Sequence, residues 1–151
     1  MGLFDRFRPV SPEKRGLQEL AELAGRKEAL IKRLKRHAAM CPYPAMNKDL
    51  EAIAEKQEEL FDSLRGCLME RDMWPRPPES LPREGLNSWE RLSGDLEMLL
   101  AQTVGFQRAS VIWEPIDGEV ADRLMAIASA DGECETMLRK IAAKCDPQAL
   151  D

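Results

Sequence analysis

The spacing of side chains in residues 124–145 strongly constrains how this chain can fold. Positions suited to a buried face recur there at steps of three and four residues: Leu124, Ile127, Asp131, Cys134, Leu138, Ile141 and Cys145. Because this spacing follows the period of an α-helix, all these side chains share one helix face. The segment therefore predicts a packed helix of a bundle, whose seam includes a carboxylate, Asp131, and a thiol, Cys134.

Three breaks divide the chain into four helical segments. They are CPYP at 41–44, the proline-rich WPRPPESLPREG at 74–85 and EPIDG at 114–118. Ser11 followed by Pro12 is a typical helix start, and Asn87 with Glu90 three residues later has the pattern of a capping box. We therefore predict an all-α protein, whose second helix runs from about Met46 to Arg71.

The two halves of the chain are similar, which suggests two copies of one helical hairpin. Residues 50–65 and 124–139 are identical at seven of sixteen aligned positions, and residues 16–30 and 85–99 at six of fifteen. The alternative is chance similarity, because Leu and Ala recur in amphipathic helices for packing reasons alone.

Two hairpins bury their apolar faces best as a four-helix bundle. About twelve extended residues reach roughly 40 Å, and a helix of about 25 residues is roughly 38 Å long. The proline-rich linker can therefore run the length of the bundle as a crossover connection. We expect a tail or docking segment at 1–10 and a bundle at 11–147, with hairpin 11–72, linker 73–86 and hairpin 87–146.

Charge and hydropathy exclude several classes of function. The net charge is −5, and the basic run RKEALIKRLKRH at 26–37 is interspersed with Leu and Ile, so we expect its cations to form a solvated face. A nucleic-acid surface needs a positive excess that this chain lacks. No apolar run approaches the ~20 residues that span a bilayer, and MGLFDRFRPV is too short and polar for a secretory signal.

The four cysteines, at 41, 67, 134 and 145, show no CxxC spacing. Together with the lack of an export signal, this indicates a reducing cytoplasm and free thiols. The crossover topology would place Cys41 and Cys145 at the same end of the bundle, so a disulfide between them is the alternative.

Aligning the two halves places polar residues on faces that should be buried. Gln57 matches Asp131, and Glu28 matches Glu97. We expect Glu28 on the apolar side of its helix and Glu97 at the border of the apolar side. A buried carboxylate is costly unless it is paired, protonated or bound to a metal, so these positions need partners.

The segments HAAMCPYPAMNKDLEAIAEKQEEL and DGEVADRLMAIASADGEC resemble the ferritin-like superfamily, notably its rubrerythrin-type diiron proteins. The pattern typical of that superfamily is I-A-x-x-E-E-x-H-x-x-x-L, preceded by a hairpin turn such as APYP. The resemblance covers most of residues 12–146 and implies a duplicated hairpin with a long crossover. It also implies that each half gives one Glu from its first helix and a Glu-x-x-His from its second.

The ligand positions that this resemblance assigns hold other residue types in this chain. They are Gln57 and Leu60 in the first half and Asp131 and Cys134 in the second, while the single histidine, His37, lies elsewhere. Glu28 and Glu97 alone keep the expected type. A diiron centre with oxygen or peroxide chemistry is therefore not expected.

Two interpretations of the interior remain open. In the first, Glu28, Glu97, Asp131 and Cys134 form a residual site for iron, zinc or manganese. In the second, no metal binds, and Gln57 hydrogen-bonds to Asp131 across the core, filling the space of a lost metal site.

The function we expect is that of a non-catalytic helical bundle, acting as a structural or protein-interaction module. The alternative is a divergent metal-binding protein. The chain shows no nucleophile pattern and no Gly-rich phosphate loop, so we expect no enzymatic activity. The sequence names no partner protein. A homodimer is one expected assembly, and residues 1–10 are a candidate contact with a partner or a membrane surface.

Overall fold

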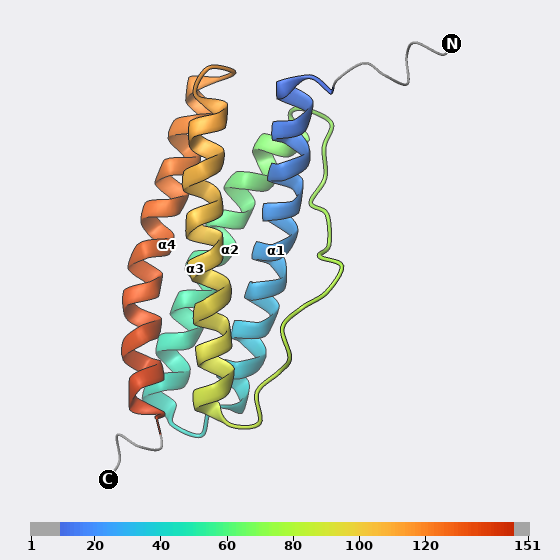
Figure 1. Ribbon diagram of the computed structural model, residues 1–151. Coiled ribbons are helices and arrows are strands. Elements are labelled where there is room, and N and C mark those ends of the chain that lie inside the picture. The colour runs from blue at the N-terminus through green and yellow to red at the C-terminus, as the bar shows by residue number, and fades with distance from the viewer. Residues whose placement is uncertain (1–9, 147–151) are drawn as a thin grey trace.

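The computed structural model describes residues 10–146, which form four α-helices: α1 Pro12–Met40, α2 Pro44–Met69, α3 Ser88–Trp113 and α4 Gly118–Lys144. The described residues contain no strand, so the prediction of an all-α protein is confirmed. The helices stand side by side as a bundle (Figure 1). Between residues 10 and 146, no helix is long and apolar enough to cross a bilayer. The N-terminal segment that we predicted as a docking element lies, up to residue 9, outside the described residues.

Two helices begin at the side-chain caps that the sequence predicts. The Ser11 hydroxyl oxygen accepts a hydrogen bond from the Lys14 backbone N–H at 3.2 Å. The Asn87 Oδ1 atom accepts from the Glu90 backbone N–H at 2.8 Å, and the Glu90 Oε2 atom accepts from the Leu86 N–H at 2.7 Å. The contacts of Ser11 and Asn87 satisfy N–H groups that the first helical turn leaves without a partner, and the contact of Glu90 holds the residue that precedes the cap of α3.

The second helix is displaced from its predicted range. It starts at Pro44 rather than Met46. Proline fits the first helical turn, because a backbone N–H at that position would have no partner within the helix. It ends at Met69 rather than Arg71, since the chain turns there and Asp72 adopts a positive φ of 54°.

The two hairpins are joined by a long crossover. α1 and α2 run antiparallel, as do α3 and α4, and the linker between α2 and α3 follows α1 from one end of the bundle to the other (Figure 1). α1 also packs on α3, and α2 on α4. The predicted topology, a four-helix bundle of two hairpins with a crossover, is therefore confirmed.

A backbone contact fixes the upper part of the linker on α1. The Arg76 N–H donates to the Ala21 carbonyl oxygen at 2.8 Å. Gly25 makes this approach possible, because a Cβ atom on Gly25 would lie 1.6 Å from the Arg76 carbonyl oxygen.

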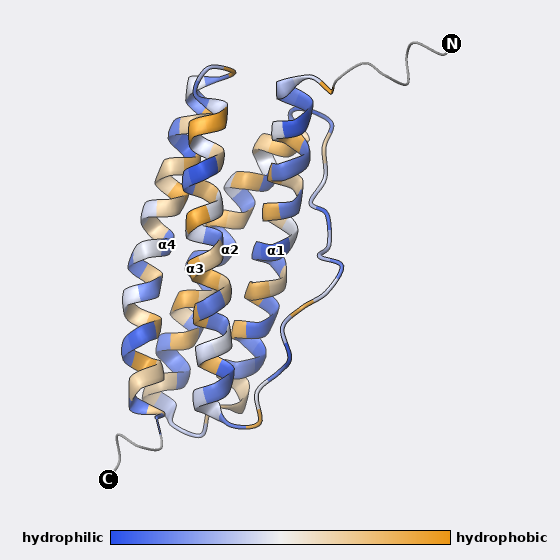
Figure 2. Cartoon of the chain, in the orientation of Figure 1, coloured by the Kyte–Doolittle hydropathy of each residue, from blue (hydrophilic) through white to orange (hydrophobic). Residues whose placement is uncertain are grey.

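The core consists of two apolar clusters, one that includes Phe106 and one that includes Leu99. Hydrophobic residues recur along all four helices, whereas the linker is mostly hydrophilic (Figure 2). Between the two clusters, each helix contributes at least one buried polar side chain: Lys27, Gln57, Gln102, Thr103 and Asp131. The bundle therefore has a polar layer at mid-height.

All four cysteines are free thiols, and Cys41 and Cys145 lie at the same end of the bundle, as the crossover topology predicted. The Cys145 thiol is 3.7 Å from the Met46 sulfur. Partial burial raises the pKa of Cys145, and the neighbouring Cys41 raises it further. Both effects disfavour the thiolate form.

Candidate functional site

The mid-height polar layer is built around a completely buried lysine. Lys27 of α1 has no exposed surface, and its ammonium Nζ donates to Gln57 Oε1 at 2.6 Å. The same atom donates to both carboxylate oxygens of Asp131, at 2.9 and 3.1 Å. The ring of Phe106 lies 5.1 Å away and adds a cation–π contact. The lysine thus joins α1, α2 and α4 and packs against α3.

Gln57 completes this network in the way that the sequence suggested. Its Nε2 group donates to Asp131 Oδ1 at 2.8 Å, so the predicted hydrogen bond across the core is confirmed. Neither Gln57 nor Asp131 has exposed surface. Each polar end of Gln57 therefore has a partner, which is the condition for burying an amide at low cost.

The buried environment shifts the proton affinities of two groups in this layer. Desolvation lowers the pKa of Lys27, while the charge and hydrogen bond of Asp131 oppose this shift. Desolvation also raises the pKa of the Cys134 thiol, and a hydrogen bond from Gln57 acts in the opposite direction. Cys134 is thus favoured as a neutral thiol, which is a poor metal ligand.

The four candidate metal ligands do not come together. Asp131 and Cys134 lie in the core, but the Glu28 side chain is 44% exposed and pairs with Lys32 on the surface at 3.5 Å. Glu97 is also exposed. The expectation that Glu28 lies on the apolar side of its helix and Glu97 at the border of that side is therefore wrong. In α1 the preceding residue, Lys27, is buried instead, and in α3 the residue two positions earlier, Asp95, is buried.

A diiron centre does not fit the residues that meet at mid-height. One carboxylate, one amide and one thiol converge there, and the Lys27 ammonium group already contacts both the amide of Gln57 and the carboxylate of Asp131. A metal cation placed there would meet a positive charge and too few oxygen donors. Within residues 10–146, no group of three His, Cys, Asp or Glu side chains is arranged to hold a metal ion.

A second buried polar cluster lies lower in the bundle. Asp95 of α3 has no exposed surface and accepts from Arg33 Nε at 3.1 Å. Its other oxygen lies 2.5 Å from His37 Nδ1, and the opposite ring nitrogen of His37 lies 2.7 Å from Glu84 in the linker. Because both neighbours are carboxylates, His37 can donate to both only as an imidazolium.

This lower cluster fastens the linker to α1. Arg33 Nη1 donates to the Pro82 carbonyl oxygen at 2.8 Å, and Arg36 donates to Glu84 from two nitrogens at 2.6 and 2.8 Å. The hydrogen bond from Arg36, followed by that from His37, lowers the pKa of Glu84. The linker is thus held at this level by charge-assisted hydrogen bonds.

We expected the cationic residues of 26–37 to form a solvated face, and this prediction is wrong at three positions. Lys27, Arg33 and His37 are 0%, 3% and 3% exposed. The signal was present for Lys27, because it lies three residues after Ala24 and four before Ile31, on the apolar stripe of α1. Asp95 likewise lies between Leu92 and Leu99 at helical spacing. Because Lys27 and Asp95 are charged, we did not assign them to the inner face, although their spacing places them there.

Comparison with known proteins bears on the fold. No protein-family model and no curated protein matches the sequence. Among solved structures, the chain is similar to Dps from Thermosynechococcus elongatus, with a TM-score of 0.76 and 10% sequence identity. The match covers 85% of this chain and 90% of that one. Together with the paired hairpins and the long crossover, this similarity shows that the chain shares the four-helix-bundle fold of that Dps structure.

Proposed function

We propose that this protein is a ferritin-like bundle that works without a metal centre. The observation that carries the proposal is the position of Lys27 Nζ. This atom lies within 3.1 Å of both Gln57 and Asp131 at mid-height in the bundle, between the two hairpins. The ammonium group supplies a positive charge in the core, where the family resemblance implies metal ions. No cofactor is needed to neutralise Asp131.

The same network favours a non-catalytic role. Lys27, Gln57 and Asp131 have no exposed surface, so a substrate cannot reach them without opening the bundle. A catalytic group must come within hydrogen-bond distance of its substrate. We therefore assign the polar layer to stability and to the register of the helices rather than to chemistry.

A role in protein interaction is supported by the outer face of α3. Leu100, Val104 and Val111 are 37%, 51% and 69% exposed, and their spacing of four and seven residues places them on one side of the helix. Exposed apolar stripes of this kind are typical of association surfaces. The proposed partner is a second copy of this chain or another protein.

Elemental analysis tests the absence of a metal centre. The untagged protein would be incubated with ferrous iron, manganese or zinc and desalted before measurement. We expect no stoichiometric retention of any of the three metals. Stoichiometric retention that is abolished by Cys134→Ala or Asp131→Asn would contradict the proposal and restore the metalloprotein alternative.

Light scattering tests the interaction surface. We expect wild-type protein to associate and a Val104→Glu/Val111→Glu variant to remain monomeric, because the new charges repel across a paired face. Ala126→Glu/Ser129→Glu adds the same two charges at exposed positions of α4, away from this stripe, and serves as the control. A monomeric wild type whose mass is unchanged over a wide concentration range would exclude the homodimer.

A further inference from the structure

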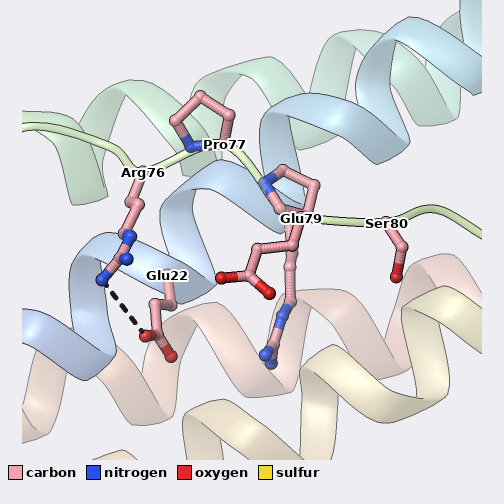
Figure 3. Close-up of a pocket in the computed structure, with 7 residues that line it drawn as sticks. Glu22, Arg76, Pro77, Glu79 and Ser80 are labelled. Carbon is pink, nitrogen blue, oxygen red and sulfur yellow. Dashed lines mark ion pairs between the residues drawn. The ribbon is translucent and has the colours of Figure 1, made fainter.

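A groove runs between α1, α3 and the linker. It consists of three adjoining hollows of about 360, 230 and 470 Å³, all of which are lined by Arg26. In the first hollow, Arg76 of the linker faces Glu22 of α1 at 3.9 Å, and Pro77 and Ser80 belong to the linker wall (Figure 3). The second hollow lies between the linker and α3.

The groove exists because the linker is fixed at two levels and stands away from the helices between them. Above, the Arg76 N–H is bonded to the Ala21 carbonyl oxygen. Below, the Pro82 carbonyl oxygen accepts from Arg33. The intervening residues include two prolines, which have no N–H to satisfy and favour an extended path. The groove is therefore already formed in the folded protein.

The second hollow combines apolar walls with a single charge. Leu81 and Pro82 from the linker face Met98 and Ala101 from α3, and Arg26 is the one charged residue in its lining. The first hollow differs, because the carboxylates of Glu22 and Glu79 line it together with its two arginines. Charge thus favours an anion in the second hollow and not in the first.

Arg26 is available for such an anion. Its side chain is exposed, and it has no ion-pair partner among residues 10–146. Arg76, in contrast, already pairs with Glu22. A guanidinium group binds a carboxylate through two parallel N–H groups, which gives direction as well as strength.

Gln102 supplies a second, independent feature of the same hollow. Its side chain is 2% exposed, and its Nε2 group donates to the Arg26 carbonyl oxygen at 3.1 Å. Its Oε1 atom is buried with no hydrogen-bond partner among the described residues. A buried acceptor of this kind calls for a donor, and Gln102 lines the hollow in which a donor could be placed.

We propose that the second hollow binds a small carboxylate that has a branched or linear aliphatic chain and a hydroxyl or N–H group next to the carboxylate. The carboxylate pairs with Arg26, the aliphatic chain packs against Leu81 and Met98, and the hydroxyl or N–H donates to Gln102 Oε1. The volume of the hollow suits a ligand smaller than a drug-sized molecule.

Three related probes test this assignment on the full-length protein: 2-hydroxyisocaproate, isocaproate without the hydroxyl, and isoamyl alcohol without the carboxylate. Titrations would be followed by amide NMR shifts. We expect saturable shifts at residues 26, 80–82 and 98–102, with a Kd on the order of 1 mM for the hydroxy acid. Isocaproate should bind several-fold more weakly, and the alcohol should give no saturable shift.

Variants identify the residues responsible. Arg26→Gln and Ala101→Glu should each weaken binding of the hydroxy acid by about tenfold or more, since one removes the cation and the other adds a carboxylate to the wall. Lys14→Gln and Gln107→Glu make the same charge changes on exposed positions of the same helices, outside the groove, and should leave the Kd unchanged. Amide spectra that retain wild-type dispersion establish that each variant is folded.

Two results would overturn the proposal. One is a lack of saturable shifts around the second hollow with any probe. The other is an affinity that is the same for the carboxylates and the alcohol, or the same in Arg26→Gln as in wild type. Equal affinity for the two acids would remove Gln102 as the acceptor.

Discussion

The ammonium nitrogen of Lys27 lies 2.9 Å from a carboxylate oxygen of Asp131, although the two residues are 104 positions apart in the chain. Neither side chain has exposed surface. Gln57 bonds to both, so the contact links one helix of the second hairpin to both helices of the first. An ion pair in this setting is costly to form but much more costly to break on one side.

Replacing Lys27 with methionine should strongly destabilise the protein. The substitution keeps a side chain of similar length but leaves Asp131 as a buried carboxylate without a cation. We expect the free energy of unfolding to fall by about 3–5 kcal/mol, measured by urea denaturation. The control Lys32→Met removes an exposed lysine of the same helix and should cost about 0.5 kcal/mol or less.

Replacing the whole network should restore stability. In Lys27→Met/Gln57→Leu/Asp131→Leu, no buried polar group of the trio is left without a partner. We expect this variant to be at least as stable as wild type, because apolar packing replaces a desolvated ion pair without loss. A triple variant less stable than Lys27→Met alone would show that the network does more than neutralise its own charges.

Gly25 and Gly66 form a matched pair for testing how the linker docks. A methyl group on Gly25 would lie 1.6 Å from the Arg76 carbonyl oxygen, so Gly25→Ala must push the linker off α1. We expect a loss of about 1–3 kcal/mol. Gly66 has nothing within 4 Å of the same position, and Gly66→Ala should stabilise α2 by about 0.5–1 kcal/mol. Thermal unfolding measures the change in stability caused by each substitution. A loss for Gly25→Ala together with a gain for Gly66→Ala supports the observed path of the linker, and equal changes in the two variants argue against it.

His37 and Arg36 both contact Glu84, but only His37 is buried. His37→Leu takes a donor away from buried Asp95 and should cost about 1–3 kcal/mol. Arg36→Leu removes an exposed ion pair and should cost about 1 kcal/mol at most. Trypsin cleavage after Arg83, next to Glu84, reports locally on the linker and should accelerate more in His37→Leu. Equal cleavage rates in the two variants would contradict a fastening role for the buried histidine.

The contact of Glu84 with Arg36 and His37 should make stability depend on acid pH. Its pKa is lower in the folded protein than its ordinary value of 4.5, so the unfolded chain takes up the proton first as the pH falls. The stabilisation is therefore complete above about pH 5 and declines as the pH drops through the folded value. Glu84→Gln should flatten this acid decline in urea unfolding between about pH 5 and 3. Glu133→Gln, at an exposed position of α4, should leave the decline unchanged.

Much of the local structure followed from sequence patterns. Six of the seven predicted seam residues of α4 are buried, namely Leu124, Ile127, Asp131, Cys134, Leu138 and Ile141, whereas Cys145 at the end of the helix is only partly buried. The caps at Ser11 and Asn87 were predicted because they depend on residues three positions away. Aligning the two halves also identified the Gln57–Asp131 hydrogen bond, although the internal repeat itself remains a prediction.

The residue of α1 that faces the interior at the level of Asp131 was predicted wrongly. Glu28 was expected inside, but Lys27 is buried, and adjacent helical residues point about 100° apart. To choose between Glu28 and Lys27 from the sequence, one would have to know that the Asp131 carboxylate of α4 is buried at the same level and needs a cationic partner. The buried Arg33 and His37 were missed for a similar reason, because their partners Asp95, Pro82 and Glu84 come from α3 and the linker.

The helices, their breaks, the apolar faces and a linker long enough to cross the bundle were predictable from the sequence, because these features depend on periodicity and on chain length. Which charged side chains are buried depends instead on how the four helices and the linker pack together. A lysine or arginine enters a core when a carboxylate or carbonyl from another element neutralises it, and that partner is set by packing over long distances in the chain. The groove beside Arg26 was decided in the same way, by where the linker touches α1 and where it stands away.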